Sequence, residues 1–572
     1  MLARLGLLLT IALVAAAPAS AAVVTSTEMV PVSSPDEVGL PVSLDTDVRV
    51  PSGTPPAGGW PLVVVFHGGG SDKANAFDAS HAQAFAEHGY ASLIYSARGH
   101  GASGGQVTVA GPKEVRDGFD VIAWALRRFP LDRDRIALTG YSQGGLHTNL
   151  LQAWAGDRSL NPEGIRFRAL LPGNTPDVTF RALVDHDAVK LSFGAGLIAT
   201  YQGGARGRVA PIVDKWIATA VADAPALYGG GDVCDWSGHD ALASTMQADL
   251  AARSVGCRAD RMTLPTLWMQ AFDDELFPAD MAIAMWRRMP DPANRLYLSM
   301  GGHGAPSADP AVEDEKLRAQ IAFLDHVLEG RPLDAPRIVY WSRDPAVVLA
   351  DGVRAWPRGA WVRHESPSWP PPGVRAERFV LGADGRATRR GRVTSGAVRL
   401  LPVSEDLGND PIYRSAAPAA PPPTTHPGTL AAFATGAFTS DRELSGTPSA
   451  RVAWTPDGPD SQLVLKVLDQ APDGTLTLLG RGVQGLRGQA PGTRRDVTVE
   501  TKPTSAIIRR GHRVVLWVTA ADSSFYKLYP GQAGGVLAAG RSSTATLPLR
   551  LRFSDAARGR PPGTRDAGGR PG

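Results

Sequence analysis

The chain has 572 residues, of which 43% are hydrophobic and 20% are charged, and its formal net charge is +3. A chain of this length is too long for a single hydrophobic core, so several domains are expected. The small net charge disfavours nucleic acid as a partner, because nucleic-acid-binding surfaces are strongly basic.

The first 21 residues have the pattern of a secretory signal peptide. Arg4 precedes an apolar run that begins at Leu5, and the small residues Ala19, Ser20 and Ala21 follow it. The run is short for a membrane span, and no basic stop-transfer flank comes after it. We therefore expect cleavage after Ala21 and a secreted or periplasmic protein without a stable membrane anchor.

Residues 22–174 alternate short apolar runs with amphipathic stretches from about residue 40 onward. "PLVVVF" (61–66) and "RIALT" (135–139) predict buried strands, and "EVRDGFDVIAWALRRF" (114–129) has the apolar spacing of a helix. Repeated strand–helix–strand units favour a mostly parallel sheet with helices on both faces. We assign residues 22–174 to the first part of an α/β core.

Residues 175–260 break this rhythm with mixed helical segments and glycine clusters. The strand signal returns in "TLPTLWMQAF" (263–272) and "RLYLSM" (295–300), which an amphipathic helix follows. We therefore predict a mainly helical cap at 175–260 and the second part of the core at 261–331.

The only two cysteines, Cys234 and Cys257, both lie in the predicted cap. In an exported protein an even pair favours one disulfide, and two buried free thiols are the alternative. Two cysteines cannot form a cysteine-based zinc site of the usual kind, and the sequence has no H-E-x-x-H motif. We expect neither a metal nor a cofactor.

The character of the chain changes after residue 331. Short β-rich runs such as "QLVLKVLD" (462–469) and "HRVVLWVTA" (512–520) are separated by glycine, proline and aspartate turns. This spacing predicts an antiparallel β-sandwich or jelly roll over residues 332–553. Residues 554–572 lack large apolar side chains and are expected to be a disordered tail.

Two serines, Ser103 and Ser142, lie in G-x-S-x-G patterns. A nucleophile elbow requires a strand, a sharp glycine-flanked turn and then a helix. Ser142 lies between the strand "RIALT" and the helix-compatible "LHTNLLQAWA", whereas Ser103 leads into "QVTVAGP", which is not a helix start. The sequence therefore predicts Ser142 as a catalytic nucleophile and a flexible loop around Ser103.

A serine nucleophile needs a histidine base and a carboxylate that orients it, and in this kind of sheet both follow the serine along the chain. His303 comes directly after a predicted strand, and Asp273 and Asp274 end the strand before it. We predict His303 as the base. Physical reasoning alone leaves either aspartate as its partner.

The oxyanion of an acyl-transfer intermediate needs two preorganised hydrogen-bond donors. One expected donor is the backbone N–H of Gln143, which follows the nucleophile. The other is expected from the "HGGG" turn (67–70), with Gly69 favoured and Gly68 as the alternative. We interpret His67 as a structural residue of that turn.

The ordered set "RGHGASGG", "GYSQGG", "AFDDELFP" and "GGHG", followed by "FLDHVLEG" and a β-rich region, resembles the X-Pro dipeptidyl-peptidase and cocaine esterase-like hydrolases. The resemblance implies an α/β-hydrolase fold with an inserted helical cap and a C-terminal all-β jelly-roll domain. It also implies Ser142 as nucleophile, His303 as base and Asp274 as the acid. Members of the family commonly take an oxyanion donor from a tyrosine in the loop after the early strand. Here that loop, "HGGGSDKANAF" (67–77), has no tyrosine, so a backbone donor is implied instead.

Three functions remain open at this point. The first is ester hydrolysis through an acyl-enzyme, with a small-molecule ester as substrate. The second is release of X-Pro dipeptides, which needs a carboxylate for the substrate's amine; Asp232, Asp235 and Asp240 are candidates. The third is binding of a carbohydrate or a surface by the jelly roll. The sequence does not indicate the oligomeric state.

Overall fold

The computed structural model describes residues 22–204, 208–221, 234, 248–289, 291–303, 310–344, 361–403, 428–529 and 531–550. The predicted signal peptide and the predicted C-terminal tail lie outside these residues. Asp232, Asp235 and Asp240, the candidate amine-binding carboxylates of the cap, also lie outside them.

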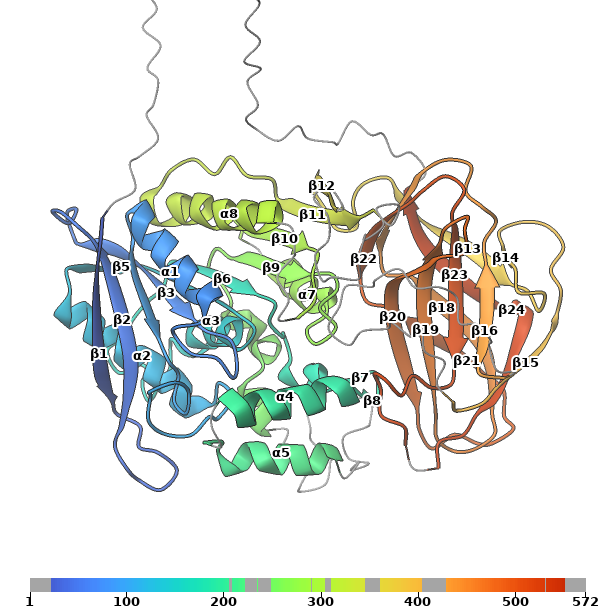
Figure 1. Cartoon of the computed structure of the whole chain (residues 1–572), viewed down its shortest axis with the longest axis horizontal. Coiled ribbons are helices and arrows are strands. Elements are labelled where there is room, and N and C mark those ends of the chain that lie inside the picture. The colour runs from blue at the N-terminus through green and yellow to red at the C-terminus, as the bar shows by residue number, and fades with distance from the viewer. Residues whose placement is uncertain are drawn as a thin grey trace, which may run out of the picture.

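The core is built around a mostly parallel sheet (Figure 1). Its strand order is β1-β2-β4-β3-β5-β6-β9-β10-β11-β12, with antiparallel pairs only at the two ends. The inner strands read as continuous apolar runs because helices cover both faces of the sheet. The strands are β1 (Val23–Val32), β2 (Val42–Pro51), β3 (Trp60–Phe66), β4 (Ala91–Tyr95), β5 (Leu131–Tyr141), β6 (Ala169–Gly173), β9 (Leu267–Ala271), β10 (Arg295–Ser299), β11 (Ile338–Arg343) and β12 (Trp361–Ser366).

The helices of the core divide between the two faces of the sheet. The chain steps outward from β3 to β4 and then back across β3 to β5, so right-handed crossovers place α1 and α2 on opposite faces. Accordingly, α1 packs beside α8, and α2 packs beside α3. The helices are α1 (Ala76–His88), α2 (Pro112–Arg128), α3 (Gln143–Trp154), α7 (Ala279–Arg288) and α8 (Pro310–Glu329).

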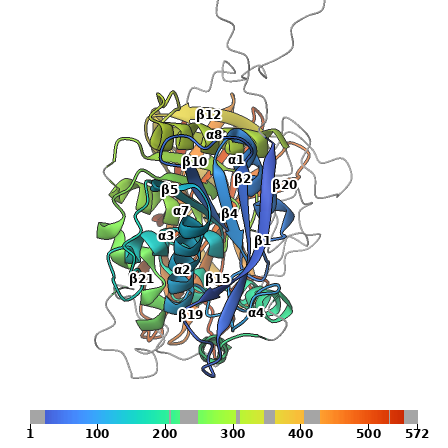
Figure 2. The ribbon, with the colours of Figure 1, turned by 90° about the vertical axis from the view of Figure 1, so that its left-hand side faces the viewer.

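The hairpin of β1 and β2 precedes the alternating pattern that we read in the sequence. Figure 2 shows both strands along the outer edge of the core. Met29 and Val24 of β1 are exposed, whereas Val30 is fully buried. Most side chains of β1 are exposed or half-buried, so its sequence lacks the continuous apolar run that marks the inner strands.

The cap contains both short strands and helices, and it lies against the core and the C-terminal sheets (Figure 1). The backbone N–H of Lys527 donates to the carbonyl of Val189, which joins the cap hairpin to the C-terminal region. Within the described residues, no helix is both long and apolar enough to cross a membrane. The cap elements are η1 (Thr179–Ala182), β7 (Val184–Asp185), β8 (Ala188–Val189), α4 (Leu191–Gly204), α5 (Pro211–Val221) and η3 (Val255–Arg261).

The C-terminal region, called the sandwich below, packs a four-stranded antiparallel sheet against a larger one. Its core includes the buried side chains of Trp454, Leu465, Leu516 and Leu537. The small sheet has the order β16 (Leu430–Ala434), β23 (Arg513–Thr519), β19 (Ser461–Gln470) and β20 (Leu476–Leu486). The larger sheet contains β13 (Val374–Leu381), β14 (Ala387–Thr388), β15 (Gly396–Leu400), β17 (Arg442–Gly446), β18 (Ser449–Pro456), β21 (Arg495–Glu500), β22 (Thr504–Ile508) and β24 (Gly535–Arg550).

Strand β11 joins the two regions. It pairs in parallel with β10 of the core along its first half, and Arg343 at its end pairs with Ala506 of β22. We drew the division between core and sandwich at residue 331, between α8 and β11. In the folded chain β11 and β12 extend the edge of the core sheet, and β11 also pairs with β22 of the sandwich, so the boundary falls beside a strand that both regions share.

Candidate active site

Ser142 lies at a sharp turn between β5 and α3, where it has φ 58° and ψ −124°. The two glycines of its G-x-S-x-G pattern allow this turn to pack tightly. A Cβ atom on Gly144 would lie 2.1 Å from the carbonyl oxygen of Phe66 in β3, and one on Gly140 would lie 2.6 Å from the backbone carbon of Gly144. Strand β3 and helix α3 therefore approach each other closely only because both positions are glycine.

Ser142, His303 and Asp274 form a hydrogen-bonded chain. Ser142 Oγ lies 2.9 Å from His303 Nε2, and His303 Nδ1 lies 2.9 Å from Asp274 Oδ2. The side chain of Asp274 is fully buried, and that of His303 is 14% exposed. The ring of Phe277 packs edge-on against the imidazole. The three predicted residues are thus brought together in the geometry of a serine–histidine–carboxylate relay.

The two adjacent aspartates have different partners. Asp274 accepts hydrogen bonds from the backbone N–H of Phe277 at 2.8 Å and from the Gln270 amide at 3.3 Å, in addition to its contact with His303. Asp273 forms an ion pair with Arg343 instead. The structure therefore shows that Asp274, and not Asp273, contacts His303, a choice that physical reasoning from the sequence left open.

The second G-x-S-x-G serine has a structural environment. Ser103 is fully buried; its hydroxyl donates to the carbonyl of Ser96 at 2.6 Å and accepts from the backbone N–H of Asp45 at 2.9 Å. These bonds fix the loop after β4. The loop around Ser103 is thus held by hydrogen bonds, contrary to the flexible loop expected from its glycines.

The turn that contains Gly68 and Gly69 is held by two buried histidines. His67 Nε2 accepts from the backbone N–H of Ala97 at 2.9 Å, so its Nδ1–H donates to the carbonyl of Gly68 at 2.7 Å. His100 Nε2 likewise accepts from the backbone N–H of Gly70 at 3.2 Å. Both roles require a neutral imidazole. Burial, reinforced by nearby His100, lowers the pKa of His67 to about 3.

Acidification should therefore destabilise the protein through this turn. The unfolded chain binds a proton at His67 below pH 6.5, whereas the folded chain does not until about pH 3, so stability falls as pH drops across this window. At pH 5 the expected loss from His67 is about 2 kcal/mol. We expect His67→Gln to be less stable than wild type at pH 7 in urea unfolding. Because glutamine does not titrate, the difference between the two free energies of unfolding should be smaller at pH 5 than at pH 7. An equal deficit at both pH values would contradict the assignment.

Two residues near the nucleophile were not predicted from the sequence. Tyr201 Oη of α4 donates to Gln143 Oε1 at 2.8 Å, and Gln143 Nε2 donates to buried Glu114 at 3.2 Å. A Cβ on Gly69 would lie 2.6 Å from the Tyr201 hydroxyl, so the phenol also closes over the glycine turn. Gln143 is thus fixed by its side chain as well as by its place at the start of α3.

Glu114 is ionised although it is fully buried. Burial opposes its charge, but hydrogen bonds from His147 and Thr108 hold its pKa well below the usual range. A sequence signal for Glu114 existed, because a charged residue occupies the apolar stripe of α2. No comparable signal marks Tyr201, since a tyrosine in an apolar helix is ordinary.

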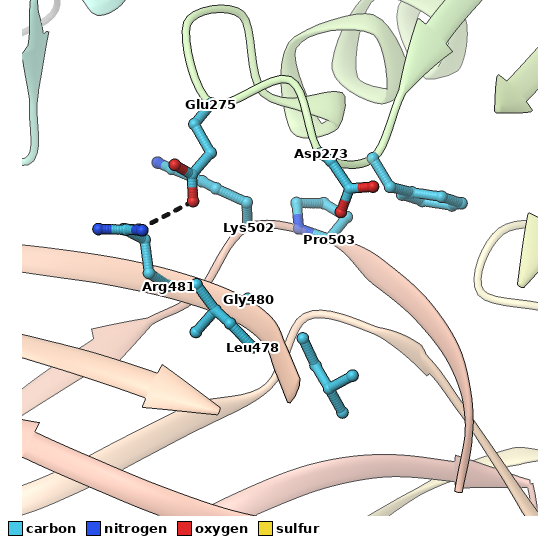
Figure 3. A pocket seen from close by; sticks show the side chains of 9 residues that line it. Asp273, Glu275, Leu478, Gly480, Arg481, Lys502 and Pro503 are labelled. Carbon is cyan, nitrogen blue, oxygen red and sulfur yellow. Dashed lines mark hydrogen bonds and ion pairs between the residues drawn. The ribbon is translucent and has the colours of Figure 1, made fainter. Parts of the chain in front are cut away.

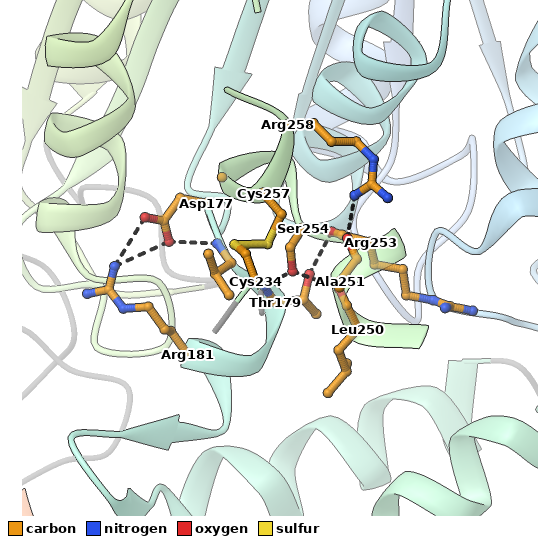
Figure 4. The surroundings of a disulfide bond; sticks show 12 residues. Asp177, Thr179, Arg181, Cys234, Leu250, Ala251, Arg253, Ser254, Cys257 and Arg258 are labelled. Carbon is orange, nitrogen blue, oxygen red and sulfur yellow. Dashed lines mark hydrogen bonds and ion pairs between the residues drawn. A yellow bond between two sulfur atoms is a disulfide. The ribbon is translucent and has the colours of Figure 1, made fainter. Parts of the chain in front are cut away.

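The two cysteines form a disulfide, with their Cα atoms 5.3 Å apart (Figure 4). Cys257 lies in η3, which packs on α3. The neighbouring Gly256 N–H donates to the carbonyl of Asp177 at 2.7 Å. The bond therefore ties Cys234 of the cap to a segment that rests on the helix following the nucleophile.

Family sequence models match two parts of the chain, one in the core and one in the C-terminal region. The sequence model described as X-Pro dipeptidyl-peptidase (S15 family) matches residues 39–161, and that of the X-Pro dipeptidyl-peptidase C-terminal non-catalytic domain matches residues 333–539. Together these matches span more than half of the 572 residues. The chain belongs to the X-Pro dipeptidyl-peptidase (S15) family.

Solved structures of hydrolases share the fold of this chain. A CocE/NonD family hydrolase from Staphylococcus aureus is 13% identical with a TM-score of 0.65, over 92% of this chain and 94% of that one. An aminopeptidase from a marine-sediment Thaumarchaeota archaeon is 16% identical with a TM-score of 0.66, over 92% and 96%. An alpha-amino acid ester hydrolase is 14% identical with a TM-score of 0.64, over 94% and 98%. Comparison with curated protein sequences gave no match.

Three predictions are confirmed by these comparisons. The chain has the predicted α/β-hydrolase fold with a C-terminal β-rich domain, it belongs to the family that its motifs resemble, and it is a serine hydrolase of the ester- or peptide-cleaving type. Such a hydrolase acts on small ester or peptide substrates. The similarity to solved structures concerns the fold, because their sequence identities are low.

Proposed function

We propose that this hydrolase cleaves a carboxylic ester through an acyl-enzyme formed on Ser142. The observation that carries the proposal is the relay in which Ser142, His303 and Asp274 are joined by two contacts of 2.9 Å at a nucleophile elbow. A serine hydroxyl becomes a competent nucleophile when a base accepts its proton and a carboxylate orients that base.

The reaction then runs in two halves. Ser142 Oγ attacks the ester carbonyl carbon while His303 Nε2 takes the hydroxyl proton, and the tetrahedral intermediate collapses as His303 returns that proton to the departing alcohol. Water, deprotonated by the same nitrogen, then attacks the acyl carbon, and the second intermediate collapses as His303 gives that proton to Ser142 Oγ and the acid is released. Asp274 holds the Nδ1–H tautomer and stabilises the imidazolium in both halves.

We propose the backbone N–H groups of Gln143 and Gly69 as the oxyanion donors. Gln143 is the first residue of α3, where backbone N–H groups have no carbonyl partner within the helix. The helix N-terminus also favours developing negative charge. The glycine turn lies beside the nucleophile, because a Cβ on Gly68 would lie 3.8 Å from the Cβ of Ser142, and Gly69 is the next residue of that turn.

We also propose that the protein is exported. The N-terminal pattern of Arg4, an apolar run and Ala19-Ser20-Ala21 predicts a secretory signal peptide. The disulfide between Cys234 and Cys257 supports this, because disulfides persist in oxidising compartments and are rare in the cytosol.

The test is a paired assay on the purified mature protein, with a short-chain p-nitrophenyl ester and an Ala-Pro p-nitroanilide. We expect ester cleavage, and we expect Ser142→Ala to lower kcat by about 10⁴-fold or more. Ser103→Ala is the matched control, because it removes the same hydroxyl from the other G-x-S-x-G pattern; its activity per folded molecule should stay near that of wild type.

Each other outcome has a distinct meaning. Rapid release from the anilide by the wild type would assign the protein to the X-Pro dipeptidyl-peptidases. Absence of any hydrolysis would favour a carbohydrate- or surface-binding protein. Full activity in Ser142→Ala would refute the nucleophile itself.

A further inference from the structure

The loop between β9 and α7, called the acid loop (residues 273–277), carries Asp274. Residues of β11, of the sandwich and of the cap form ion pairs and hydrogen bonds with this loop. A small cleft at the boundary between core and sandwich is lined by Asp273 and Glu275 on one side and by Arg481 and Lys502 on the other (Figure 3). The two residues that flank Asp274 thus face the sandwich. Asp274 itself faces His303.

Asp273 is held by Arg343, at the end of β11. The Arg343 side chain is 1% exposed, and its Nη2 forms an ion pair with Asp273 Oδ1. Its Nη1 donates to the carbonyl of Leu478 in β20 at 2.6 Å. One buried guanidinium therefore connects the residue before Asp274 to the sandwich.

Glu275 is held by Arg481 of β20. The Arg481 side chain is 2% exposed, and its Nε donates to Glu275 Oε1 at 2.9 Å (Figure 3). Its Nη1 donates to Asp522 at 2.9 Å. From the cap, buried Lys190 Nζ donates to the carbonyl oxygens of Glu275 and Leu276 at 2.8 and 3.2 Å. The residue after Asp274 is therefore fixed by its side chain and by its backbone.

We propose that the sandwich is a positioning element of the hydrolase, and that Arg481 acts through Glu275 to hold Asp274 against His303. This inference rests on the proposed role of Asp274 as the acid of the relay. Arg481 is a positioning residue, since it touches neither substrate nor the reacting atoms.

The arrangement has the properties that such a role requires. A buried guanidinium keeps its charge and strongly favours a paired carboxylate, so the Arg481–Glu275 contact is a rigid attachment. The carboxylate of Asp274 must lie within hydrogen-bond distance of His303 to stabilise the imidazolium, and displacement of a relay group by about 1 Å can cost about 10²-fold in rate. The titratable and charged groups in and around the acid loop include Asp273, Asp274, Glu275, His303, Arg343, Arg481, Asp522, Lys466, Lys502 and Lys190.

The experiment compares Glu275→Gln with Arg481→Met in the full chain. Each change breaks the same ion pair, and Arg481→Met leaves Asp522 with its contact to Lys466 at 3.3 Å. We expect each variant to lower kcat by about 10- to 100-fold while KM changes by less than about threefold. The acidic limb of the kcat/KM profile should move to lower pH by about half a unit or more, because a loosened carboxylate favours the imidazolium less.

The direction of the two shifts separates positioning from a simple field effect. Removal of the Glu275 charge alone would move the acidic limb of the profile to lower pH, whereas removal of the Arg481 charge alone would move it to higher pH. Positioning predicts a shift to lower pH in both variants, and a double variant that is no worse than either single one. Shifts in opposite directions would overturn the proposal. Arg481→Lys should recover part of the lost kcat.

Lys502→Met is the matched control. Lys502 lines the same cleft, but its ammonium pairs with Asp185 of the cap at 2.6 Å. The Lys502→Met substitution should weaken the contact between cap and sandwich and so lower the thermal unfolding midpoint. The kcat and the acidic limb of the kcat/KM profile should stay as in wild type. Equal losses of kcat in Lys502→Met and Glu275→Gln would show a general effect of the interface and overturn the proposal. Wild-type kinetics in Glu275→Gln, with Ser142→Ala inactive, would refute the positioning role and leave the proposed function intact.

Discussion

Asp274→Asn should lower kcat by about 10⁴-fold, because the asparagine amide cannot stabilise the imidazolium and favours the wrong tautomer of His303. Its Oδ2 is the atom that lies 2.9 Å from His303 Nδ1. KM should change little, since Asp274 is fully buried behind the histidine and does not face the substrate. Steady-state kinetics of the ester reaction measure both quantities.

Asp273→Asn is the matched comparison, because it makes the same chemical change one residue away. It weakens the ion pair with Arg343 and leaves the contact between Asp274 and His303 in place. We expect a loss of kcat of about tenfold at most, together with a lower unfolding midpoint, because a buried arginine loses its charged partner. If Asp273→Asn proved the more damaging change, the assignment of the acid would have to be reversed.

Gly144→Ala should both destabilise the protein and disable the elbow. The new Cβ would lie 2.1 Å from the carbonyl oxygen of Phe66 and 3.0 Å from that of His67, and neither backbone atom belongs to a flexible side chain. Overpacking of this kind costs about 1–3 kcal/mol or more. The strain falls on Ser142 and on the start of the glycine turn together, so we expect a loss of about 10²-fold or more in kcat/KM.

Gly156→Ala provides the control for this change. Gly156 follows the end of α3, and a Cβ there would meet nothing within 4 Å. We expect unchanged kinetics and a stability gain of about 0.4–1 kcal/mol, because alanine restricts the unfolded chain. Activity of Gly144→Ala should be expressed per active site, titrated with an organophosphate, so that unfolded protein is not counted. Kinetics like those of wild type in Gly144→Ala would mean that the strand and helix do not approach as closely as described.

The elbow could be predicted because its determinants are local in sequence. A strand, two glycines around Ser142 and a helix occupy consecutive positions, and each has a recognisable pattern. Asp274 and His303 could be predicted because each comes directly after a strand, and parallel strands bring their carboxyl ends to one edge of the sheet. The same reasoning recovered the α/β core and the β-rich C-terminal region.

The unpredicted features depend on contacts between residues far apart in the chain. Arg481 reaches Glu275 across 206 residues, and Tyr201 reaches Gln143 across 58. No local periodicity encodes such pairs. For the same reason the sequence does not reveal that β11 pairs with β10 of the core as well as with β12 and β22, which follow it. The choice between Asp273 and Asp274 likewise needed the position of Arg343.

The backbone conformation of Ser142 lowers the stability of the fold at the residue that the proposed activity requires. A φ of 58° with a ψ of −124° is sparsely populated by residues that carry a Cβ, and holding one there costs about 1–3 kcal/mol. Glycine would occupy the same conformation without that cost. Selection for stability alone would therefore replace the residue on which the proposed chemistry depends, and the serine persists in this turn only as long as hydrolysis is under selection.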